Sequence, residues 1–393
     1  MKTHYLKALG LILALLAALL SVSCGVSGAG GGIGGSGIIS VGMITAFGSI
    51  VVNGAEFDTR NAEVIVEGEI IGIGDDVVLD NLDIGMVVTV EGAGSEDEGN
   101  LVADRVIYND NVEGPVQSIS VVNDIRKEIV VLGQTVILNP VTTFKGTTFD
   151  DIAVNDVVEV SGYSDDAGDI WATFLKKTDG VIFEVTGLVE NLDTFQETFN
   201  INDLSVDYSL ADTSGLPGGV PIVGLLVEVE GTLTDDVMIA DVIELGDELD
   251  PEDADEIEVT GFVTDVVSVF EFTVGTQVVR TDANTEFVDG TADDIVLGQK
   301  LEAEGSLENG ILFADEVEFW DPDQIEVEGL VTEDNLAPDE FTVGDQVVET
   351  DAETIFEPED LIIEEGIILE VKGVPRDISR TVLDADKVSL EED

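Results

Sequence analysis

Val227-Glu228-Val229-Glu230-Gly231 is a stretch in which β-branched residues alternate with carboxylates and a glycine closes the run. Successive side chains of a β-strand point to opposite faces, so this alternation predicts a strand with its valines inward and its glutamates in solvent. The same pattern ends at four other strand-closing glycines of the 393-residue chain, Gly92, Gly162, Gly305 and Gly373. The recurrence indicates one structural unit that occurs five times.

Two further features recur in step with this strand. A glycine after a short β-type stretch opens each copy, at Gly42, Gly114, Gly187, Gly261 and Gly329. Seven residues before each strand-closing glycine stands Gly85, Asn155, Gly224, Gly298 or Gly366. Glycine and asparagine tolerate the positive φ of a tight turn, so this position predicts a turn. Correlated features in five copies are typical of a tandem repeat.

Each copy has about 65 to 70 residues and alternates with period two, without a long amphipathic helix. In the fourth copy the pattern predicts strands over 256–265, 269–274, 277–282, 299–306 and 311–319, and a helical turn over 292–296. Closing short strands into a barrel removes exposed edges that would aggregate. We therefore predict an all-β fold of five tandem small β-barrels, each five-stranded and similar to the oligonucleotide/oligosaccharide-binding (OB) barrel.

The predicted modules are named by their order in the chain. Module one covers residues 39–109, module two 111–179, module three 181–246, module four 256–321 and module five 324–391, and residues 247–255 form an acidic linker. In a string of repeats each unit touches its neighbours, so we expect the contacts between modules to stay local.

The N-terminus resembles a bacterial lipoprotein signal. Lys2 and Lys7 precede an apolar run from Leu9 to Leu20, which is too short for the roughly 20 residues of a membrane span, and Cys24 follows small residues. The resemblance implies a signal peptide at 1–23, a lipid on Cys24 and an outer-membrane or cell-surface location; a periplasm-facing orientation stays open. A plain secretory peptide is the alternative. The Gly-rich residues 24–38 are predicted to be a flexible tether.

The charge and the rare residues exclude several classes of function. The chain has 84 acidic and 15 basic residues, a formal net charge of -69, and a phosphate backbone would be repelled by such a protein. His4 and Cys24 are its one histidine and one cysteine. Cleavage and lipidation would leave neither available, so we expect no cofactor, no zinc site and no catalytic relay. We predict that the protein is not an enzyme and does not bind nucleic acid.

Modules one and two carry a family resemblance. Residues 44–54, Ile-Thr-Ala-Phe-Gly-Ser-Ile-Val-Val-Asn-Gly, then Phe57-Asp58-Thr59, then residues 85–92 and Val112-Glu113-Gly114-Pro115-Val116 resemble the bacterial domain-of-unknown-function family numbered 5666. The resemblance implies tandem small β-barrels in secreted proteins and lipoproteins, without an established activity or catalytic residues. It is strong in modules one and two and weaker in modules three to five.

Two groups of polar residues have a structural and a functional interpretation. Residues 247–258 hold eight acids in twelve positions, and Asp250, Glu252, Asp253 and Asp255 are candidates for weak contacts with divalent cations, since Ca²⁺ takes oxygen ligands. A solvated linker is the favoured interpretation of such a run. Asp165-Asp166-Ala167-Gly168-Asp169 has the composition of a hairpin turn, which we prefer over metal ligation. The aromatic residues Tyr108, Tyr163, Trp171, Tyr208 and Trp320 are predicted to be core or strand-edge residues and not a sugar-stacking platform.

Three functions remain open. The leading hypothesis is a non-catalytic, lipid-anchored string of acidic β modules in the cell envelope with a structural or interaction role, as a spacer or an adhesion-like protein. The second is a set of modules that bind a glycan or a peptide of the envelope, and the third is a surface protein that responds to calcium. The expected partners are the membrane, through Cys24, and an unknown envelope protein or glycan.

Overall fold

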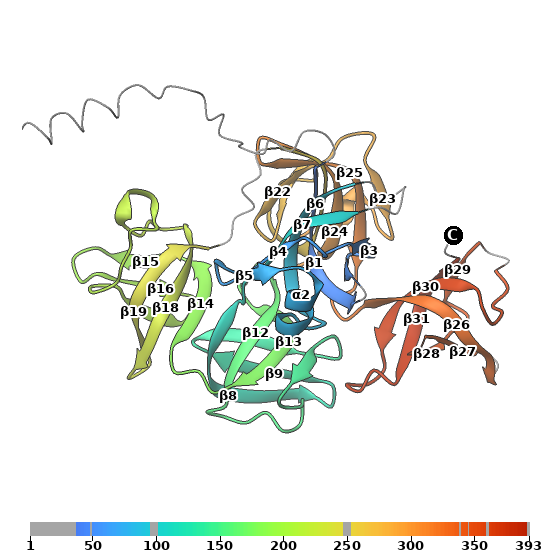
Figure 1. Ribbon diagram of the computed structural model, residues 1–393, viewed down its shortest axis with the longest axis horizontal. Coiled ribbons are helices and arrows are strands. Elements are labelled where there is room, and N and C mark those ends of the chain that lie inside the picture. Colours follow the sequence, from blue (N-terminus) through green and yellow to red (C-terminus); the bar gives the residue numbers. More distant parts are fainter. Residues whose placement is uncertain are drawn as a thin grey trace, which may run out of the picture. The chain divides into compact units, whose positions relative to one another are not determined.

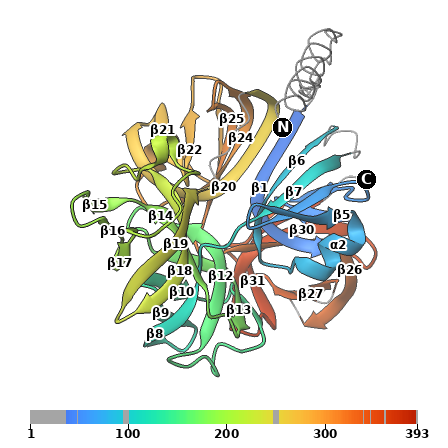
Figure 2. The same cartoon turned by 60° about the vertical axis from the view of Figure 1, so that its left-hand side comes forward.

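The computed structural model describes residues 37–47, 49–94, 101–246, 253–337, 339–344, 346–358 and 361–390. Within these ranges the protein is built almost entirely of β-strands, which confirms the all-β prediction (Figures 1 and 2). None of the helices there is long and apolar enough to cross a membrane. The predicted signal peptide, Cys24, most of the tether, Asp250 and Glu252 lie outside the described residues.

Module two shows how the strands pair. Its strands are β8 (Val112–Asn123), β9 (Arg126–Val131), β10 (Gln134–Leu138), β11 (Thr143–Lys145), β12 (Val157–Ser164) and β13 (Ile170–Thr178). β8, β9 and β10 form an antiparallel meander, β10 pairs in parallel with β13, and β12 pairs with both β13 and β8. Five strands thus close a ring in the order first, second, third, fifth, fourth. The apolar side chains of its alternating strands, such as Ile129 and Val158, are fully buried.

Module three repeats this ring. Its elements are β14 (Phe183–Leu188), β15 (Glu190–Asp193), β16 (Thr198–Ile201), β17 (Leu204–Asp207), the 3-10 helix η2 (Pro217–Gly219), β18 (Leu226–Thr234) and β19 (Val237–Leu245). β14 and β15 together form the first strand, interrupted at the buried Val189. β16, β17, β19 and β18 follow around the ring, with β17 parallel to β19 and β18 back beside β14.

Module four follows the strand pattern predicted from its sequence. Its elements are β20 (Asp253–Ser268), β21 (Glu271–Val274), β22 (Gln277–Arg280), β23 (Glu286–Val288), the 3-10 helix η3 (Ala292–Asp294), β24 (Lys300–Glu308) and β25 (Ile311–Trp320). The five predicted strands and the helical turn are all confirmed, although β20 begins inside the expected linker. Its strands pair in the order of modules two and three.

Module five closes in the same way. Its strands are β26 (Ile325–Ala337), β27 (Glu340–Val343), β28 (Gln346–Glu349), β29 (Ile355–Glu357), β30 (Ile368–Pro375) and β31 (Val382–Leu390). β28 pairs in parallel with β31, which pairs antiparallel with β30, and β30 returns to β26. β29 adds a short parallel strand beside β31, as β11 and β23 do beside β13 and β25.

Module one is the most divergent. Its elements are β1 (Gly37–Phe47), β2 (Ile50–Val52), β3 (Ala55–Phe57), β4 (Glu63–Val66), β5 (Glu69–Ile73), the helix α2 (Asp75–Asn81), β6 (Val87–Ala93) and β7 (Val102–Tyr108). β1 pairs with β2 and β6, and a single bridge from Asp58 to Val102 joins the end of the β2–β3 hairpin to β7. β5 is an extra strand that pairs with β4. The acids that begin α2, Asp75 and Asp76, suit the positive end of its dipole.

The strand-closing glycines mark a β-bulge in every module. At Gly231 the register between β18 and β19 shifts, and equivalent shifts occur at Gly92, Gly162, Gly305 and Gly373. A Cβ on Gly231 would lie 2.9 Å from the carbonyl carbon of Ile239 and 3.0 Å from the Cα of Ala240. These are backbone atoms of the neighbouring strand, so any side chain would force the two strands apart. The predicted turn residues Gly85, Asn155, Gly224, Gly298 and Gly366 all have positive φ, as expected.

Edge strands also pair between modules. β8 of module two pairs antiparallel with β14 of module three, at Glu113 and Glu184. β1 of module one pairs in parallel with β20 of module four, over Ile38–Val41 and Glu256–Val259. Modules one and four are not neighbours in the sequence, so the expectation that contacts between modules stay local is wrong here. Part of the first strand of a barrel has backbone N–H and C=O groups that are not paired within its own ring. The first strand of another module can form hydrogen bonds with these groups.

We predict that Gly231→Ala destabilises module three by about 1–3 kcal/mol, because the added methyl group overlaps backbone atoms that cannot rotate away. The measurement is amide hydrogen exchange of β18 and β19. The matched control is Gly215→Ala in the same module, where the new Cβ would meet mainly the flexible side chain of Glu244, at 3.3 Å. Equal loss of protection in both variants would contradict this account of the bulge.

Candidate functional site

The predicted cation contacts in the linker do not form a described site. Asp253 lies opposite Glu308 in β20, and Asp255 is an exposed residue of the same strand. Asp250 and Glu252 lie outside the described residues. Among the residues that the structure describes, the spacing needed by a metal ion is met by another group, Glu67, Glu184 and Glu228.

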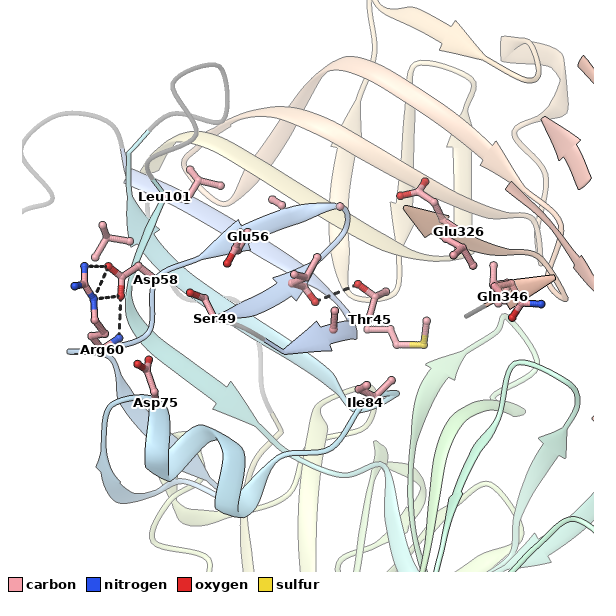
Figure 3. Close-up of a pocket in the computed structure, with 18 of the residues that line it drawn as sticks. Thr45, Ser49, Glu56, Asp58, Arg60, Asp75, Ile84, Leu101, Glu326 and Gln346 are labelled. Atoms are coloured by element: carbon pink, nitrogen blue, oxygen red, sulfur yellow. Dashed lines mark hydrogen bonds and ion pairs between the residues drawn. The ribbon is translucent and has the colours of Figure 1, made fainter. Parts of the chain in front are cut away.

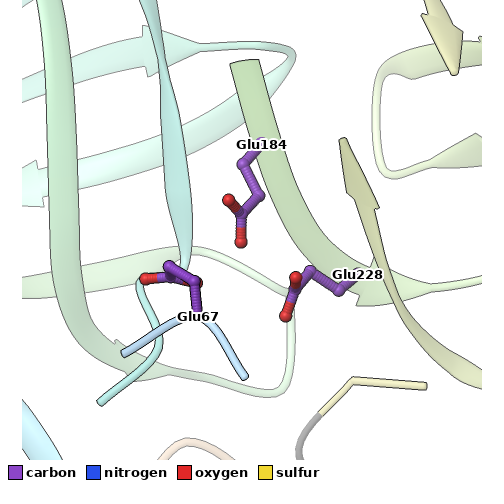
Figure 4. A group of neighbouring side chains, drawn as sticks. All are labelled: Glu67, Glu184 and Glu228. Carbon is purple, nitrogen blue, oxygen red and sulfur yellow. The ribbon is translucent and has the colours of Figure 1, made fainter. Parts of the chain in front are cut away.

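We call Glu67, Glu184 and Glu228 the triglutamate cluster (Figure 4). Glu67 lies in the turn between β4 and β5 of module one, whereas Glu184 and Glu228 come from β14 and β18 of module three. Glu184 faces Glu230 across that antiparallel pair, which makes Glu228 its diagonal neighbour on the same face. One carboxylate oxygen from each member lies within 4.8 Å of the other two. Segments far apart in the sequence thus bring three acids to one point.

A fourth acid is buried beside the cluster. Asp110 is 6% exposed, and its backbone N–H donates a hydrogen bond of 3.1 Å to Oε1 of Glu67. Its Oδ1 has no hydrogen-bond partner among the described residues, and the same is true of Oε2 of Glu67 and Oε1 of Glu184. Buried polar atoms in folded proteins nearly always have partners. Three oxygens of neighbouring acids thus lack a hydrogen-bond partner among the described residues.

Burial and mutual repulsion shift the titration of these acids. Desolvation, together with neighbouring carboxylates, raises the pKa of Glu67 from 4.5 to about 7 and the pKa of Glu184 from 4.5 to about 9. The same causes raise the pKa of Asp110 well above its ordinary value. Without a cation, the cluster therefore retains protons near neutral pH.

The basic residues of the described chain have partners elsewhere. Ion pairs join Arg60 to Asp58, Arg105 to Glu91, Lys145 to Asp83, Lys176 to Glu159, Lys177 to Asp156, Arg280 to Glu271, Lys372 to Glu318, Arg376 to Glu349 and Lys387 to Glu357. Arg126 lies over the ring of Trp171, and Lys127, Lys300 and Arg380 donate to backbone carbonyls. Within the described ranges, none of the ion pairs involves Glu67, Glu184 or Asp110.

A cleft of about 1150 Å³ lies between residues of modules one and five (Figure 3). In its wall Nε of Arg60 donates a hydrogen bond of 2.8 Å to Oδ1 of Asp58. This guanidinium lowers the pKa of Asp58 to about 2. Asp75 accepts a hydrogen bond of 2.7 Å from Thr59. The residues known to line the cleft include no aromatic ring. The described part of the lining therefore offers no flat apolar surface on which sugar rings could stack.

Two of the aromatic residues singled out in the sequence, Tyr108 and Trp171, pack against other parts of the fold. Tyr108 is buried and donates to Glu159 at 3.0 Å, and the ring of Trp171 lies 5.4 Å from that of Phe262. Nε1 of Trp171 donates to Asp165 at 3.0 Å. Asp165 also begins the turn predicted for residues 165–169, because its N–H donates to the carbonyl of Asp169. The turn is confirmed, and so is the prediction of packed aromatics for these two residues.

We predict that stability in a chelator falls as the pH rises from about 4.5 through 7 to 9. Over this range the unfolded chain releases protons that the folded Glu67 and Glu184 retain, so deprotonation favours unfolding. Glu184→Gln removes one of these groups and should flatten the curve of melting temperature against pH, with a higher value than the native chain at pH 9. Glu190→Gln, an exposed change of equal charge in module three, is the control. Parallel curves for all three proteins would contradict the prediction.

Comparison with known proteins supports the repeats. Residues 113–176, 260–318 and 323–389 match the model of the family described as Domain of unknown function (DUF5666). These segments lie in modules two, four and five, which confirms the predicted resemblance for these three repeats. Modules four and five keep the glycine spacing and the strand order of module two. The search of curated proteins gave no match. The chain therefore carries repeats that resemble the DUF5666 family.

Proposed function

We propose that this protein is a non-catalytic lipoprotein of the cell envelope, in which five tandem OB-like barrels have a structural or interaction role. One observation carries the proposal: the same ring order, with a parallel pair between the third and fifth strands, recurs in modules two to five. Module one keeps its first, fourth and fifth strands in that order. A repeated small barrel is a scaffold that presents surfaces, and loops and edges vary between copies.

The chemistry available in the chain supports a non-catalytic role. After cleavage before Cys24 the chain would have no histidine, so acid–base work would fall to carboxylates. In the cleft, the carboxylates of Asp58 and Asp75 already accept hydrogen bonds from Arg60 and Thr59. A general acid or base needs to face a bound substrate, whereas Asp58 faces Arg60 and Asp75 faces Thr59.

The anchor can be tested directly. We predict that Cys24→Ser moves the protein from the membrane fraction to the soluble envelope fraction, because a lipid on the thiol would be the attachment. The measurement is cell fractionation with incorporation of labelled fatty acid, and Ser23→Ala is the control that keeps the cysteine. Unchanged fractionation of Cys24→Ser would contradict the lipoprotein proposal.

A peptide-binding role is the second candidate, and an exposed strand edge favours it over glycan binding. Among the described residues, β5 pairs with β4 alone and ends the sheet. Ile70 and Ile73 are each 61% exposed on it. An apolar, unpaired edge can pair with an added strand, and most proteins place charged side chains on such edges to prevent this pairing.

We predict that Ile70→Lys abolishes the retention of extended peptides selected from a display library by the mature chain. A lysine on an edge strand opposes strand addition without disturbing the core. Leu210→Lys, at a residue of module three that is 86% exposed, is the control. Equal retention by the two variants would exclude β5 as the peptide site, and blanks on a glycan array are expected for all of them.

A further inference from the structure

We propose that the triglutamate cluster binds one divalent cation of the calcium class and that this ion joins module one to module three. The proposal goes beyond the structural role, because it assigns a metal site and makes a contact between modules depend on an ion. It rests on the convergence of the three carboxylates, on a comparison with module five, and on the unpartnered acid beside them.

Module five has glutamates at the same two positions, and the side chain of Lys372 supplies a positive charge between them. Glu326 and Glu370 stand three residues before Gly329 and Gly373, as Glu184 and Glu228 stand three residues before Gly187 and Gly231. Nζ of Lys372 lies 2.5 Å from Glu318, 3.4 Å from Glu326 and 3.8 Å from Glu370. Two acids of one barrel and a third from another module therefore surround one positive charge.

Module three has the acids but not the lysine. Glu230 occupies the position of Lys372, immediately before the strand-closing glycine, and it faces Glu184 across the strand pair. The third acid again comes from another module, as Glu67. The barrel thus brings like charges together at a point where module five places an ammonium group. Like charges in such positions are destabilising unless a counter-charge is supplied.

In modules two and four, other residues interact with the acids at these two positions. In module two Asn111 replaces the first acid, and Lys176 pairs with the second, Glu159, at 2.6 Å. In module four hydroxyl groups donate to the two acids, Ser40 to Glu258 at 3.3 Å and Thr260 to Glu302 at 2.8 Å. In modules two, four and five the chain itself thus supplies a donor or a cation at each of these acid positions.

Asp110 provides a second, independent observation at this place. Its side chain is more than nine-tenths buried, its Oδ1 has no partner among the described residues, and its backbone N–H fixes the orientation of Glu67. Burying several carboxylates without compensation is costly, because each loses its hydration. A cation beside Glu67 and Glu184 would compensate this whole group, including Asp110.

The ligands and their spacing select the kind of ion. All candidate ligands are carboxylate oxygens, which favour hard cations such as Ca²⁺ and Mg²⁺ over zinc or copper. Ca²⁺ accepts oxygen ligands in a flexible geometry, whereas Mg²⁺ requires a near-ideal octahedron, and ligands that come from a turn of one module and two strands of another suit the more flexible ion. The site therefore fits Ca²⁺ better than Mg²⁺.

The test is a calorimetric titration of the metal-free mature chain with CaCl₂ at pH 8. We expect one saturable site with a Kd of roughly 10⁻⁵ to 10⁻³ M, and at least a tenfold weaker Kd for Glu184→Gln. Glu190→Gln, with the same loss of charge at an exposed position, should bind like the native chain. Absence of saturable heat, or equal Kd values for the two variants, would overturn the proposal.

A second measurement separates a metal site from a cluster that is merely acidic. At pH 8 in chelator Glu184→Gln should melt at a higher temperature than the native chain, because one half-buried acid is gone. In CaCl₂ the native chain should gain stability relative to NaCl of matched ionic strength, while the variant gains less. The same gain in both proteins, or a gain from MgCl₂ that equals that from CaCl₂, would overturn the calcium assignment. Neither measurement depends on the lipid anchor.

Discussion

The close approach of two backbones at the strand-closing glycine is the constraint on which the barrels depend. Opposite Gly231 the fifth strand bulges, and its backbone lies where a side chain of the fourth strand would otherwise stand. The bulge bends the pair and lets a sheet of short strands curve into a ring. The same geometry recurs at Gly92, Gly162, Gly305 and Gly373, so one local rule shapes every module.

The outer faces of these rings create an electrostatic problem that the modules solve separately. Alternation puts glutamates on the solvent face, and edge pairing between modules then covers some of them. Where Lys372 or Lys176 stands nearby, the buried carboxylates have a counter-charge. In module three Glu230 takes the place of the lysine, and the acids meet Glu67 and Asp110 instead. The proposed cation would stabilise the deprotonated group, because its charge need not be encoded in the chain.

The sequence was informative about the fold and poor at locating the site. The strands of module four and the turn at 165–169 followed from period and turn chemistry, which act over a few residues. The acidic run around Asp253 and Asp255 attracted attention because its charges are adjacent in the sequence. The triglutamate cluster has no such density, since Glu67 lies in module one and Glu228 in module three, with module two between them. Comparing equivalent positions of the repeats, where Lys372 stands against Glu230, is the signal that would have pointed to it.

By itself the sequence determined the repeat, the all-β character and the positions of the glycines, because these depend on the alternation of side chains and on the φ that each residue tolerates. The tertiary structure decided which barrels lie side by side, as β1 does with β20 and β8 with β14. Any barrel edge with free backbone groups can pair with any other, so local pattern does not select the partner. That choice brings Glu67 to Glu184 and Glu228, and only the folded chain reveals it.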